Sequence, residues 1–478
     1  MPIVSAAMDL REVMGEGPSV EISHLAHDTR EVRGGSLFFC VPGFTRDGHD
    51  LAPEAIRRGA VALVVERPLG LGVPEVRVAS VRAAMAPAAA RFHGDPTARL
   101  PVVGVTGTNG KTTTAFLIRG LLEAAGRQCG LLGTVTSFVG GSERPTVRTT
   151  PEAIELQATF AEMLAGGDSA CAMEVSSHAL ALHRADAIHW AVAIFTNLTQ
   201  DHLDFHGDME AYFRAKRRLF AAAEPGTAAI VNVDDPYGER LARELGDEVV
   251  TVGFSEAASV RARDVASDAR GAGFTLDGRE LRIGLPGRFN VLNALCAIAA
   301  ARALGLDDDT IAQALPRAGA VPGRFEPVDE GQGFTVLVDY SHTPDSLENA
   351  LRAARELTDG RVLCVFGAGG DRDRGKRPLM GAVAAELADT AIVTSDNPRS
   401  EAPEAIIAEV LAGAGGHAQP IVDRREAIFH AVGLAEEGDV VLIAGKGHEQ
   451  GQELAGGHVV PFDDVTVARE ALRGRLAI

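Results

Sequence analysis

Hydrophobic and polar residues alternate in short blocks along the first part of the chain. Up to about residue 98, the apolar runs "GGSLFFCVPG" and "AVALVVERP" flank the helix-like stretch "APEAIRRGA". Short apolar runs bounded by turn-forming residues are typical of buried strands, whereas an apolar residue at every third or fourth position indicates a helix. We therefore predict a small α/β module over residues 1–98.

From about residue 99 the pattern changes to longer units in which a strand precedes a helix. "LPVVGVTG" predicts a buried strand and "TTTAFLIRGLLEAAG" a helix that ends at Gly126, while "WAVAIFTNL" and "GTAAIVNVDD" predict further strands. Residues 256–288 are β-like and rich in glycine, and the helical stretch "NVLNALCAIAAARALG" follows them. Alternating strands and helices favour a mostly parallel sheet, so we predict a central α/β domain over residues 99–327.

A third series of strand–helix units begins near "FTVLVDYSHTPDSLENALRAARE" and continues through "RVLCVFGAGG", "DTAIVTSDNP" and "DVVLIAGKGHEQG". It predicts a third α/β domain over residues 328–478. The stretch "RFHGDPTARLP" is the predicted linker between the first two domains, because Gly94, Asp95 and Pro96 form a turn that breaks a helix.

Composition and charge exclude several classes of protein. The 478 residues are 46% hydrophobic and 23% charged, as in folded globular proteins, and the net charge of −19 disfavours nucleic acid and acidic membranes as partners. No apolar run reaches the roughly 18 residues of a membrane-spanning helix, and the first residues lack a signal-peptide pattern. The five cysteines have no metal-binding spacing. We therefore expect a cytoplasmic protein with reduced cysteines.

The stretch "VVGVTGTNGKTTT" predicts a phosphate-binding loop. A hydrophobic strand leads into a glycine turn, in which Gly107 and Gly110 would let backbone N–H groups approach phosphate oxygens. Lys111 can neutralise the β and γ phosphates of a nucleotide, and the Thr112 hydroxyl can bind Mg²⁺. Val105 replaces the first glycine of the general motif, and a glycine turn that binds nothing is the alternative. The strand before the turn and the helix after it favour nucleotide binding.

The stretch "HLDFHGDMEAYFRAKRRLF" predicts an amphipathic helix that places Lys216 among apolar side chains (Tyr212, Phe213, Leu219 and Phe220). A loop before this helix is crowded with groups of the kind that bind metals (Asp201, His202, Asp204 and His206). By composition alone, we favour a Lys216 side chain whose stem covers the helix beside Arg217 and Arg218. Asp204 and His206 are more typical of turn and surface positions.

Several motifs, taken in order, resemble those of the Mur ligases. They are "GTNGKTT", "EVSSHAL", "NLTQDHLDFHG…YFRAKRRLF", "GRFN…N", "PGRFE", "DYSHTPDSL" and "GKGHE". These ligases are ATP-dependent, amide-forming enzymes of peptidoglycan precursor synthesis, and the resemblance covers nearly the whole chain. It implies three domains: an N-terminal UDP-sugar-binding module, a central P-loop ATPase and a C-terminal Rossmann-like domain. "HDTREVRGGSLFFCVPGFTRDGHD", "GGDRDRGKRPLM" and "DNPR" resemble the type that adds the third stem-peptide residue to UDP-N-acetylmuramoyl-L-alanyl-D-glutamate.

The resemblance also implies a catalytic set. Because a carboxylate is a poor electrophile, ATP must first convert it to an acyl phosphate, and the charges that meet there need Mg²⁺ and cations. The implied catalytic residues are Lys111, Glu174, His202 and Lys216. Thr112 and Glu174 would bind one Mg²⁺ and His202 a second. In the resembling ligases this lysine carries a carbamate formed from CO₂, so Lys216 would be an N6-carboxylysine that binds the second Mg²⁺.

The resemblance implies an ATP-binding set made of the loop and of five residues further along the chain. These residues are Gly107, Thr108, Asn109, Gly110, Lys111, Thr112, Thr113, Asn290, Asn293, Arg324, Asp339 and His342. Adenine and ribose need such mixed donors and acceptors. The alternative for Asn290 and Asn293 is that they cap their helix.

A second set of residues would bind the UDP-sugar dipeptide: Thr29, Gly43, Phe44, Thr45, Arg46, Thr149, Thr150, Ser176 and Arg184. The alternative for the "HDTR" segment is an ordinary turn led by aspartate. Thr150 and Pro151 could at the same time be the N-cap and first residue of a helix. Arg148 and Leu182 depart from the familiar pattern, so some dipeptide contacts are expected to differ.

The third set would bind the incoming amino acid: Arg372, Asp396, Asn397, Pro398, Arg399, Gly445 and Glu449. "SDNPRSEAP" follows an apolar strand, where α/β domains bind ligands. Arg399 could grip the distal carboxylate of meso-diaminopimelate, which lysine lacks, and Glu449 suits an ammonium group. A solvated Arg399 in a turn is the alternative.

The predicted function is therefore ATP-dependent addition of meso-diaminopimelate by a monomer that binds only small-molecule substrates. Lysine or another diamino acid could replace diaminopimelate. A folylpolyglutamate synthase is a further alternative, but the N-terminal 98 residues argue against it. A catalytically silent homologue would not need intact Lys111, Glu174, His202 and Lys216.

Overall fold

The computed structural model describes residues 7–43, 46–222, 224–268, 270–318 and 321–476. Phe44 and Thr45, two residues of the predicted UDP-sugar site, lie outside this part of the chain. The chain divides into two compact units, which are described separately below. The first contains Met1–Thr106, Gly126–Ile194 and Ala215–Ala229, and the second contains Gly107–Ala125, Phe195–Arg214 and Ile230–Ile478.

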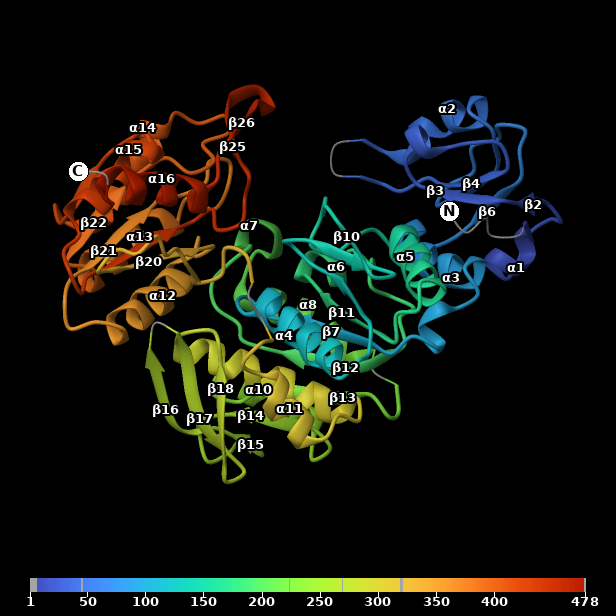
Figure 1. The fold of residues 1–478 in the computed structure, drawn as a ribbon. Coiled ribbons are helices and arrows are strands. Elements are labelled where there is room, and N and C mark those ends of the chain that lie inside the picture. The colour runs from blue at the N-terminus through green and yellow to red at the C-terminus, as the bar shows by residue number, and fades with distance from the viewer. Residues whose placement is uncertain (1–6, 44–45, 223, 269, 319–320, 477–478) are drawn as a thin grey trace. The chain divides into compact units, whose positions relative to one another are not determined.

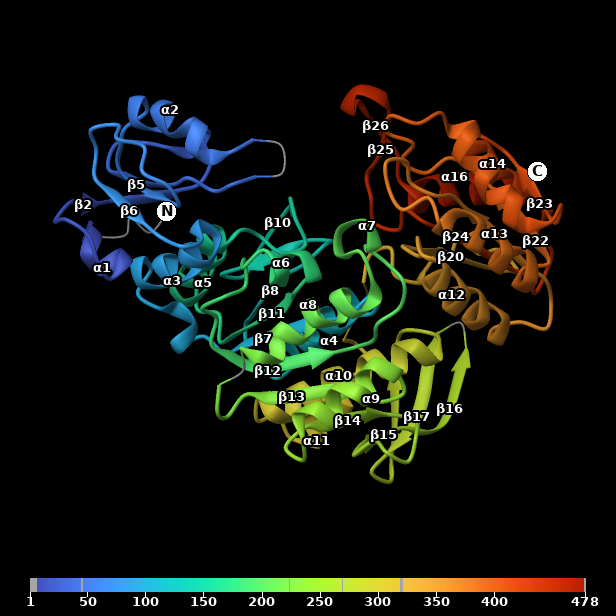
Figure 2. The same cartoon turned by 180° about the vertical axis from the view of Figure 1, so that it is seen from behind.

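The N-terminal part of the first unit is a parallel sheet covered by helices on both faces. Its strands lie in the order β3 (His24–Ala26), β4 (Ser36–Phe39), β5 (Ala60–Val65) and β6 (Glu75–Arg77). Helices α1 (Leu10–Met14) and α3 (Val81–Phe92) pack on one face and α2 (Ala52–Arg57) on the other (Figures 1 and 2). Strands buried on both faces are continuous apolar runs, which is why "SLFF" and "AVALVV" could be recognised.

A second sheet of the first unit carries two of the predicted site segments. Its order within this unit is β10 (Ser142–Arg144), β9 (Ser137–Val139), β8 (Cys129–Leu132), β11 (Ala170–Glu174), β7 (Val102–Thr106) and β12 (Trp190–Phe195). Strand β11 is parallel to β7 and β8, and its last residue, Glu174, is opposite Val105. Helices α5 (Ala153–Ala165) and α6 (Ser177–Ala181) follow β10 and β11 in the chain. Along the chain, α3 precedes this sheet, and its last two residues, Arg91 and Phe92, belong to the predicted linker.

The middle part of the second unit contains the helix after the glycine turn, α4 (Lys111–Ala124), which packs on α10 (Arg288–Ala303). Three strands pair side by side in parallel in this part: β13 (Ala228–Asn232), β14 (Val250–Gly253) and β15 (Val260–Arg261). Strands β16 (Arg263–Asp268), β17 (Gly271–Leu276) and β18 (Arg279–Ile283) form a small antiparallel sheet. Helices α9 (Pro236–Leu245) and α11 (Asp308–Ala314) complete this part. The β-like reading of residues 256–288 is thus confirmed.

The stretch from His202 to Phe220 differs from the predicted loop and single helix. It contains a short helix, α7 (Leu203–His206), and a longer one, α8 (Met209–Ala221). The chain breaks between them at Gly207, whose φ of 82° is in the left-handed region and ends α7. Asp204 and His206 therefore lie on a helix rather than in an irregular loop.

The C-terminal part of the second unit is a six-stranded sheet between two helical layers. The strand order is β19 (Glu326–Pro327), β20 (Thr335–Asp339), β24 (Val440–Ala444), β21 (Val362–Phe366), β22 (Thr390–Val393) and β23 (Ala418–Pro420), and only β19 is antiparallel. Helices α12 (Pro344–Glu356), α13 (Lys376–Leu387) and α14 (Pro403–Ala414) share one apolar core with the sheet. Helices α15 (Arg424–Leu434) and α16 (Asp464–Leu476) share the other (Figure 1). The predicted α/β class with mostly parallel sheets is confirmed.

This layered arrangement places four loops at the carboxyl ends of parallel strands, where α/β sheets bind ligands. Residues 340–342 follow β20, 367–374 follow β21, 394–399 follow β22 and 445–449 follow β24. A hairpin of β25 (Gly451–Glu453) and β26 (Val459–Pro461) continues from the last of these loops. All seven residues of the predicted amino-acid site lie in these loops.

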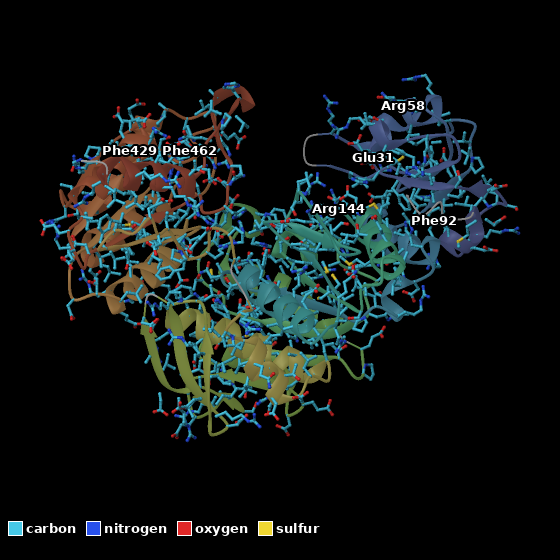
Figure 3. All side chains as sticks on the ribbon, in the orientation of Figure 1. Glu31, Arg58, Phe92, Arg144, Phe429 and Phe462 are labelled. Carbon is cyan, nitrogen blue, oxygen red and sulfur yellow. The ribbon has the colours of Figure 1, made fainter. Side chains whose placement is uncertain are left out.

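The surface and the cysteines agree with the composition. Charged side chains such as Arg58, which pairs with Glu54 on α2, lie at the surface (Figure 3). Cys40, Cys129, Cys171, Cys296 and Cys364 are all buried and unbridged. Over the described residues, the helices are too short or too polar to cross a membrane.

Candidate active site

The glycine turn before α4 has a shape that only glycine allows at two positions. Gly107 has a φ of 152° and Gly110, the N-cap of α4, a φ of 86°. A Cβ atom on Gly107 would collide with the Thr196 hydroxyl, and one on Gly110 would collide with the side-chain oxygen of Asn293. The turn therefore presents bare backbone at a helix N-terminus, as a phosphate site requires.

Two residues that follow β12 hold the turn in place. Asn197 Oδ1 accepts a hydrogen bond from the Asn109 N–H at 2.8 Å, and the Thr196 hydroxyl donates to the Asn109 carbonyl at 2.6 Å. The Lys111 ammonium group donates to the carbonyl oxygens of Gly107 (3.0 Å) and Thr108 (2.8 Å). The cation thus lies over the turn. Thr196 and Asn197 were not predicted, because a polar pair after a strand is an ordinary turn signal.

Three of the residues predicted to bind adenosine lie beside this helix, at the end of β20 or just after it. Arg324 donates to the Thr112 hydroxyl at 3.0 Å and lies over the Tyr340 ring at 4.5 Å. Burial raises the pKa of Asp339, although it accepts hydrogen bonds from Ser341 and from the Phe325 N–H. Burial also lowers the pKa of His342 to about 4, so its imidazole is neutral at pH 7.

Asn290 and Asn293 are buried on α10 and are linked to each other. The Asn293 amide donates to Asn290 Oδ1 at 3.2 Å, and the Asn290 amide donates to the Pro286 carbonyl at 2.7 Å. The N-cap of α10 is Gly287, so neither asparagine is the N-cap residue. The second unit thus brings the whole predicted ATP-binding set into one body of the chain.

Within the first unit, Glu174 lies among predicted dipeptide-binding residues. Its carboxylate is 1% exposed and accepts hydrogen bonds from the N–H (2.7 Å) and the hydroxyl (3.1 Å) of Thr134. The Thr134 hydroxyl also contacts that of Thr149 at 3.0 Å. Thr150 donates to the Glu174 carbonyl at 2.9 Å and accepts from the Ser176 N–H at 3.1 Å. The polar groups at the end of β11 are therefore closely connected.

The predicted helix cap at Thr150 is wrong. Helix α5 starts at Ala153 and its N-cap is Glu152, whose N–H donates to the Glu155 carboxylate at 3.1 Å. Glu152 is also the centre of an arginine cluster, with Arg184 at 2.9 Å and with Arg148 and Arg82 at 3.7 and 3.9 Å. Thr150 does not cap the helix, because its hydroxyl is already bonded to the Glu174 carbonyl and the Ser176 N–H at the end of β11.

The "HDTR" segment forms the aspartate-led turn that was the alternative reading. Asp28 accepts a hydrogen bond from the Arg30 N–H at 2.9 Å and caps the 3-10 turn Thr29–Glu31. Thr29 is 8% exposed. Further along, the Gly43 N–H donates to the Arg46 carbonyl at 2.9 Å, and the two residues between them lie outside the described part of the chain. A turn does not exclude a contact with UDP, since backbone groups in such turns bind ligands.

Lys216 and His202 differ in their surroundings. Lys216 is 1% exposed on α8, so its ammonium group does not reach water as the alternative reading required. His202 has a φ of 54° and pairs with Asp201 at 3.4 Å. Among the described residues, no cluster of three or more His, Cys, Asp or Glu side chains could hold a metal ion. A nucleotide-bound Mg²⁺ needs few protein ligands, because phosphates and water supply the rest, so Thr112 beside the turn fits such an ion.

The predicted amino-acid site gathers at the carboxyl ends of β22 and β24. Arg399 has a φ of 52°, and its guanidinium group donates to Glu453 Oε2 and to the Gly370 carbonyl, each at 2.8 Å. The Asn397 amide donates to Glu449 at 2.8 Å. Gly445 has a φ of 121°, and a Cβ atom there would lie 3.3 Å from Asp396. Arg399 is 21% exposed, so the alternative of a solvated arginine does not hold.

Two other predicted residues of this site have few polar contacts, and one buried residue of the site was not predicted. Arg372 is exposed, and its guanidinium group donates to the Asp371 carbonyl at 3.3 Å. Pro398 is buried in the loop between Asn397 and Arg399. Lys446, which was not predicted, is fully buried between Asn397 and Glu449. A buried lysine inside "GKGHE" could have been found by asking which charge balances the nearby carboxylates.

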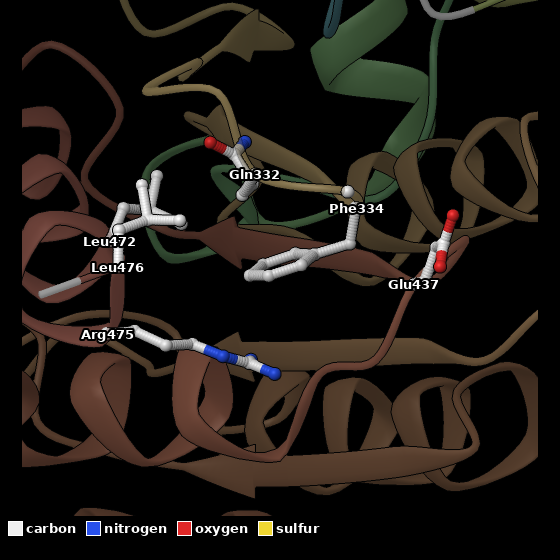
Figure 4. A pocket seen from close by; sticks show the side chains of 7 residues that line it. Gln332, Phe334, Glu437, Leu472, Arg475 and Leu476 are labelled. Atoms are coloured by element: carbon white, nitrogen blue, oxygen red, sulfur yellow. The ribbon is translucent and has the colours of Figure 1, made fainter. Parts of the chain in front are cut away.

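A separate cavity of about 250 Å³ lies near the C-terminus of the second unit (Figure 4). Its lining includes Phe334, Glu437, Leu472 and Arg475, and the Arg475 guanidinium lies 4.9 Å from the centre of the Phe334 ring. None of the predicted site residues lines it. We do not assign it to the active site.

Comparison with known proteins supports the same interpretation along the whole chain. Residues 21–104 match the model of the Mur ligase family catalytic domain, 105–301 the Mur ligase middle domain and 323–447 the Mur ligase glutamate ligase domain. UDP-N-acetylmuramoyl-L-alanyl-D-glutamate–2,6-diaminopimelate ligase of Geobacillus kaustophilus is 50% identical over an alignment of 472 residues that covers 96% of each chain.

Solved structures show the same architecture. A structure of a UDP-N-acetylmuramoyl-L-alanyl-D-glutamate–2,6-diaminopimelate ligase is 32% identical, has a TM-score of 0.71 and covers 98% of this chain and 100% of its own. Folylpolyglutamate synthase of Mycobacterium tuberculosis shares the fold at 20% identity, with a TM-score of 0.61 over 82% of this chain and 95% of its own.

The glycine turn, the strand-end loops and the three matched domains define a nucleotide-dependent ligase of the α/β class. The chain belongs to the Mur ligase family. Membership in this family confirms the predicted class of ATP-dependent, ADP-forming ligase and the predicted use of ATP and Mg²⁺.

Proposed function

We propose that the protein joins meso-diaminopimelate to UDP-N-acetylmuramoyl-L-alanyl-D-glutamate in an ATP-dependent reaction. The observation that carries this proposal is the pairing of opposite charges at the ends of β22 and β24. Arg399, 21% exposed, pairs there with Glu453 at 2.8 Å, and the carboxylates of Asp396 and Glu449 lie 3.6 and 2.9 Å from the buried Lys446. A guanidinium group suits a carboxylate and a carboxylate suits an ammonium group, and the distal end of diaminopimelate carries both. The name of the Geobacillus relative supports the same substrates.

The proposed chemistry has two steps. A carboxylate oxygen of the dipeptide substrate attacks the γ-phosphorus of ATP, the bond to the β-phosphate oxygen breaks, and ADP and an acyl phosphate result. The amine of diaminopimelate then attacks the acyl carbon and loses a proton, and the carbon–oxygen bond to phosphate breaks. The products are an amide, ADP and inorganic phosphate, so atoms and charge balance.

ATP would be held within the second unit. We propose that the backbone of residues 107–113 cradles the phosphates, with Lys111 as the neutralising cation. Asn290, Asn293, Arg324, Asp339 and His342 would contact adenosine. Support comes from the fixed shape of the turn and from Arg324. This residue donates to the Thr112 hydroxyl on α4 and lies over the ring of Tyr340, which follows β20.

Mg²⁺ would neutralise the phosphates and the charge that develops during transfer. We propose Thr112 and Glu174 as its protein ligands, and His202 and a carbamate on Lys216 as ligands of a second ion. The burial of Lys216 supports a modified or paired group, because an isolated ammonium group is costly at 1% exposure.

The first unit would bind the UDP-sugar dipeptide. The proposed contacts are Thr29, Gly43, Phe44, Thr45 and Arg46 for the UDP moiety, and Thr149, Thr150, Ser176 and Arg184 for the muramoyl dipeptide. The arginine cluster around Glu152 supports this, because three cations share one carboxylate and leave positive charge for an anionic substrate. We also propose domain boundaries at residues 1–98, 99–327 and 328–478, a monomeric state and a cytoplasmic location.

The test is ADP release and amide formation by the purified protein with ATP, Mg²⁺ and the UDP-sugar dipeptide. A panel of diaminopimelate, L-lysine and other diamino acids supplies the amine, and each component is omitted in turn. We expect product only when all components are present, and the highest kcat/KM with meso-diaminopimelate. Preference for lysine would overturn the choice of amino acid, and no ADP release with any amine would indicate a silent homologue. Glutamate addition to a folate would support the folylpolyglutamate alternative.

A further inference from the structure

Lys446 is a fully buried cation in the loop that follows β24. Its side chain is 0% exposed, and its ammonium group donates to Asn397 Oδ1 and to Glu449 Oε2, each at 2.9 Å. Asp396 Oδ1 lies 3.6 Å away. Burying an ammonium group is costly unless it is paired and hydrogen-bonded, so these contacts are what makes the position tolerable.

The contacts of Lys446 fix the direction of the Asn397 side chain. Asn397 Oδ1 accepts from Lys446 and also from the Glu453 N–H at 2.9 Å, so the oxygen must face these two donors. The Asn397 amide nitrogen then points the other way, where it donates to Glu449 Oε2 at 2.8 Å. A network in which each member has its partner holds one arrangement.

The same contacts leave one oxygen of Glu449 available. Oε2 receives hydrogen bonds from both Lys446 and Asn397, whereas over the described chain no donor contacts Oε1. The Glu449 side chain is 30% exposed, so a ligand could reach it. A carboxylate with one saturated and one open oxygen suits an ammonium group.

Local charge points in the same direction. Lys446 faces the carboxylates of Asp396 and Glu449, and the charge of the buried Lys376 also acts on Asp396. The neighbouring buried Arg424 is already matched by Asp464, through hydrogen bonds of 2.8 and 2.7 Å. Without Lys446, the Asp396 and Glu449 carboxylates would lose the cation that both of them face, which would disfavour their ionised forms.

We propose that Lys446 is a positioning residue of the amino-acid site, which holds Asn397 and Glu449 so that Glu449 Oε1 accepts the ammonium group beside the distal carboxylate of the substrate. This inference rests on the proposed function. It assigns Lys446 no contact with the substrate, and its effect is transmitted through the other two side chains.

The main test is Lys446→Met, which keeps the length of the side chain but removes its charge. We expect the KM for diaminopimelate to rise by roughly 10- to 100-fold, as for the loss of one charge-assisted contact, while the KM for ATP stays within about twofold of the parent. Lys446→Arg should keep part of the affinity, because it retains the charge. A parent-like KM for diaminopimelate in Lys446→Met would overturn the inference.

A matched control separates positioning from general destabilisation. Arg361 pairs with the buried Asp439 at 2.7 Å, at the opposite end of β24. Arg361→Met should lower the melting temperature as Lys446→Met does, yet leave the KM for diaminopimelate unchanged. An equal rise of this KM in both variants would show that the effect of Lys446 is only structural.

A double-mutant cycle with Glu449→Gln tests the route of the effect. If Lys446 acts through Glu449, either Lys446 variant should raise the KM much less in the Glu449→Gln background than in the parent, and additive effects would refute this. The cycle uses Lys446→Arg if Lys446→Met does not fold. Failure of the parent to use diaminopimelate refutes the proposed function instead, so the two failures are distinguishable.

Discussion

Replacement of Arg399 by alanine should change the choice of amino acid far more than the binding of ATP. The Arg399 guanidinium is 21% exposed and uses one N–H for Glu453 and one for the Gly370 carbonyl, each at 2.8 Å. The remaining N–H groups are available to a substrate carboxylate. Arg399 has a φ of 52°, and alanine is as strained there as arginine, so the substitution leaves the backbone cost nearly unchanged.

The magnitude follows from the kind of contact that is lost. A charge-assisted contact of a largely desolvated group contributes about 2–4 kcal/mol, which corresponds to roughly 30- to 1000-fold in kcat/KM. Diaminopimelate should lose this amount in Arg399→Ala. L-lysine, which has no distal carboxylate, should be a poor substrate of the parent and should lose much less in the variant.

The assay is kcat/KM for both amino acids with the parent, Arg399→Ala and Arg399→Lys. The lysine variant keeps the charge but not the planar pair of donors, so we expect an intermediate loss with diaminopimelate. If the parent prefers L-lysine, or if both substrates lose equally, Arg399 does not select the amino acid.

Three further predictions concern the other parts of the protein. Lys216→Ala should nearly abolish ligation, and short carboxylic acids at about millimolar concentration should partly restore it by supplying the missing anion; parent-like turnover would refute the carbamate. Gly110→Ala should lower kcat/KM for ATP by roughly tenfold or more, because its Cβ collides with Asn293 at a φ of 86°; unchanged ATP kinetics would show that the turn adapts. Burial lowers the pKa of His93 and His342 to about 4, from an ordinary value of 6.5. The unfolded chain therefore takes up protons first, so the free energy of unfolding in denaturant titrations should fall from pH 6.5 toward pH 4. His93→Gln should weaken this fall, and an equal fall in the variant would contradict the assignment.

Much of the fold could be predicted from the sequence because its parallel strands are buried on both faces. The runs of β5 and β24 are continuously apolar and are bounded by glycine and charged residues, so their positions are plain. The division of residues 202–220 into two helices was missed. It depends on the left-handed conformation at Gly207, and a glycine within an amphipathic pattern does not by itself show that conformation.

The site was predicted only where a residue type carries its own chemical signal. Gly107, Gly110 and Lys111 form such a signal together. Lys446 and Asn197 do not, because their roles depend on neighbours far away in the chain: Lys446 on Asn397, and Asn197 on the backbone of the glycine turn. The cap at Thr150 was mispredicted for the same reason, since its hydroxyl is bonded to groups at the end of β11.

The central claim is that a carboxylate of the dipeptide substrate is activated by ATP and then joined to diaminopimelate. Its most direct test uses a UDP-sugar dipeptide whose reacting carboxylate is labelled with ¹⁸O, together with ATP, Mg²⁺ and meso-diaminopimelate. Mass spectrometry of the released phosphate should show one ¹⁸O atom for each amide formed, because the oxygen that attacks phosphorus leaves with it. Amide formation with unlabelled phosphate, or labelled phosphate without an amide of diaminopimelate, would contradict the account.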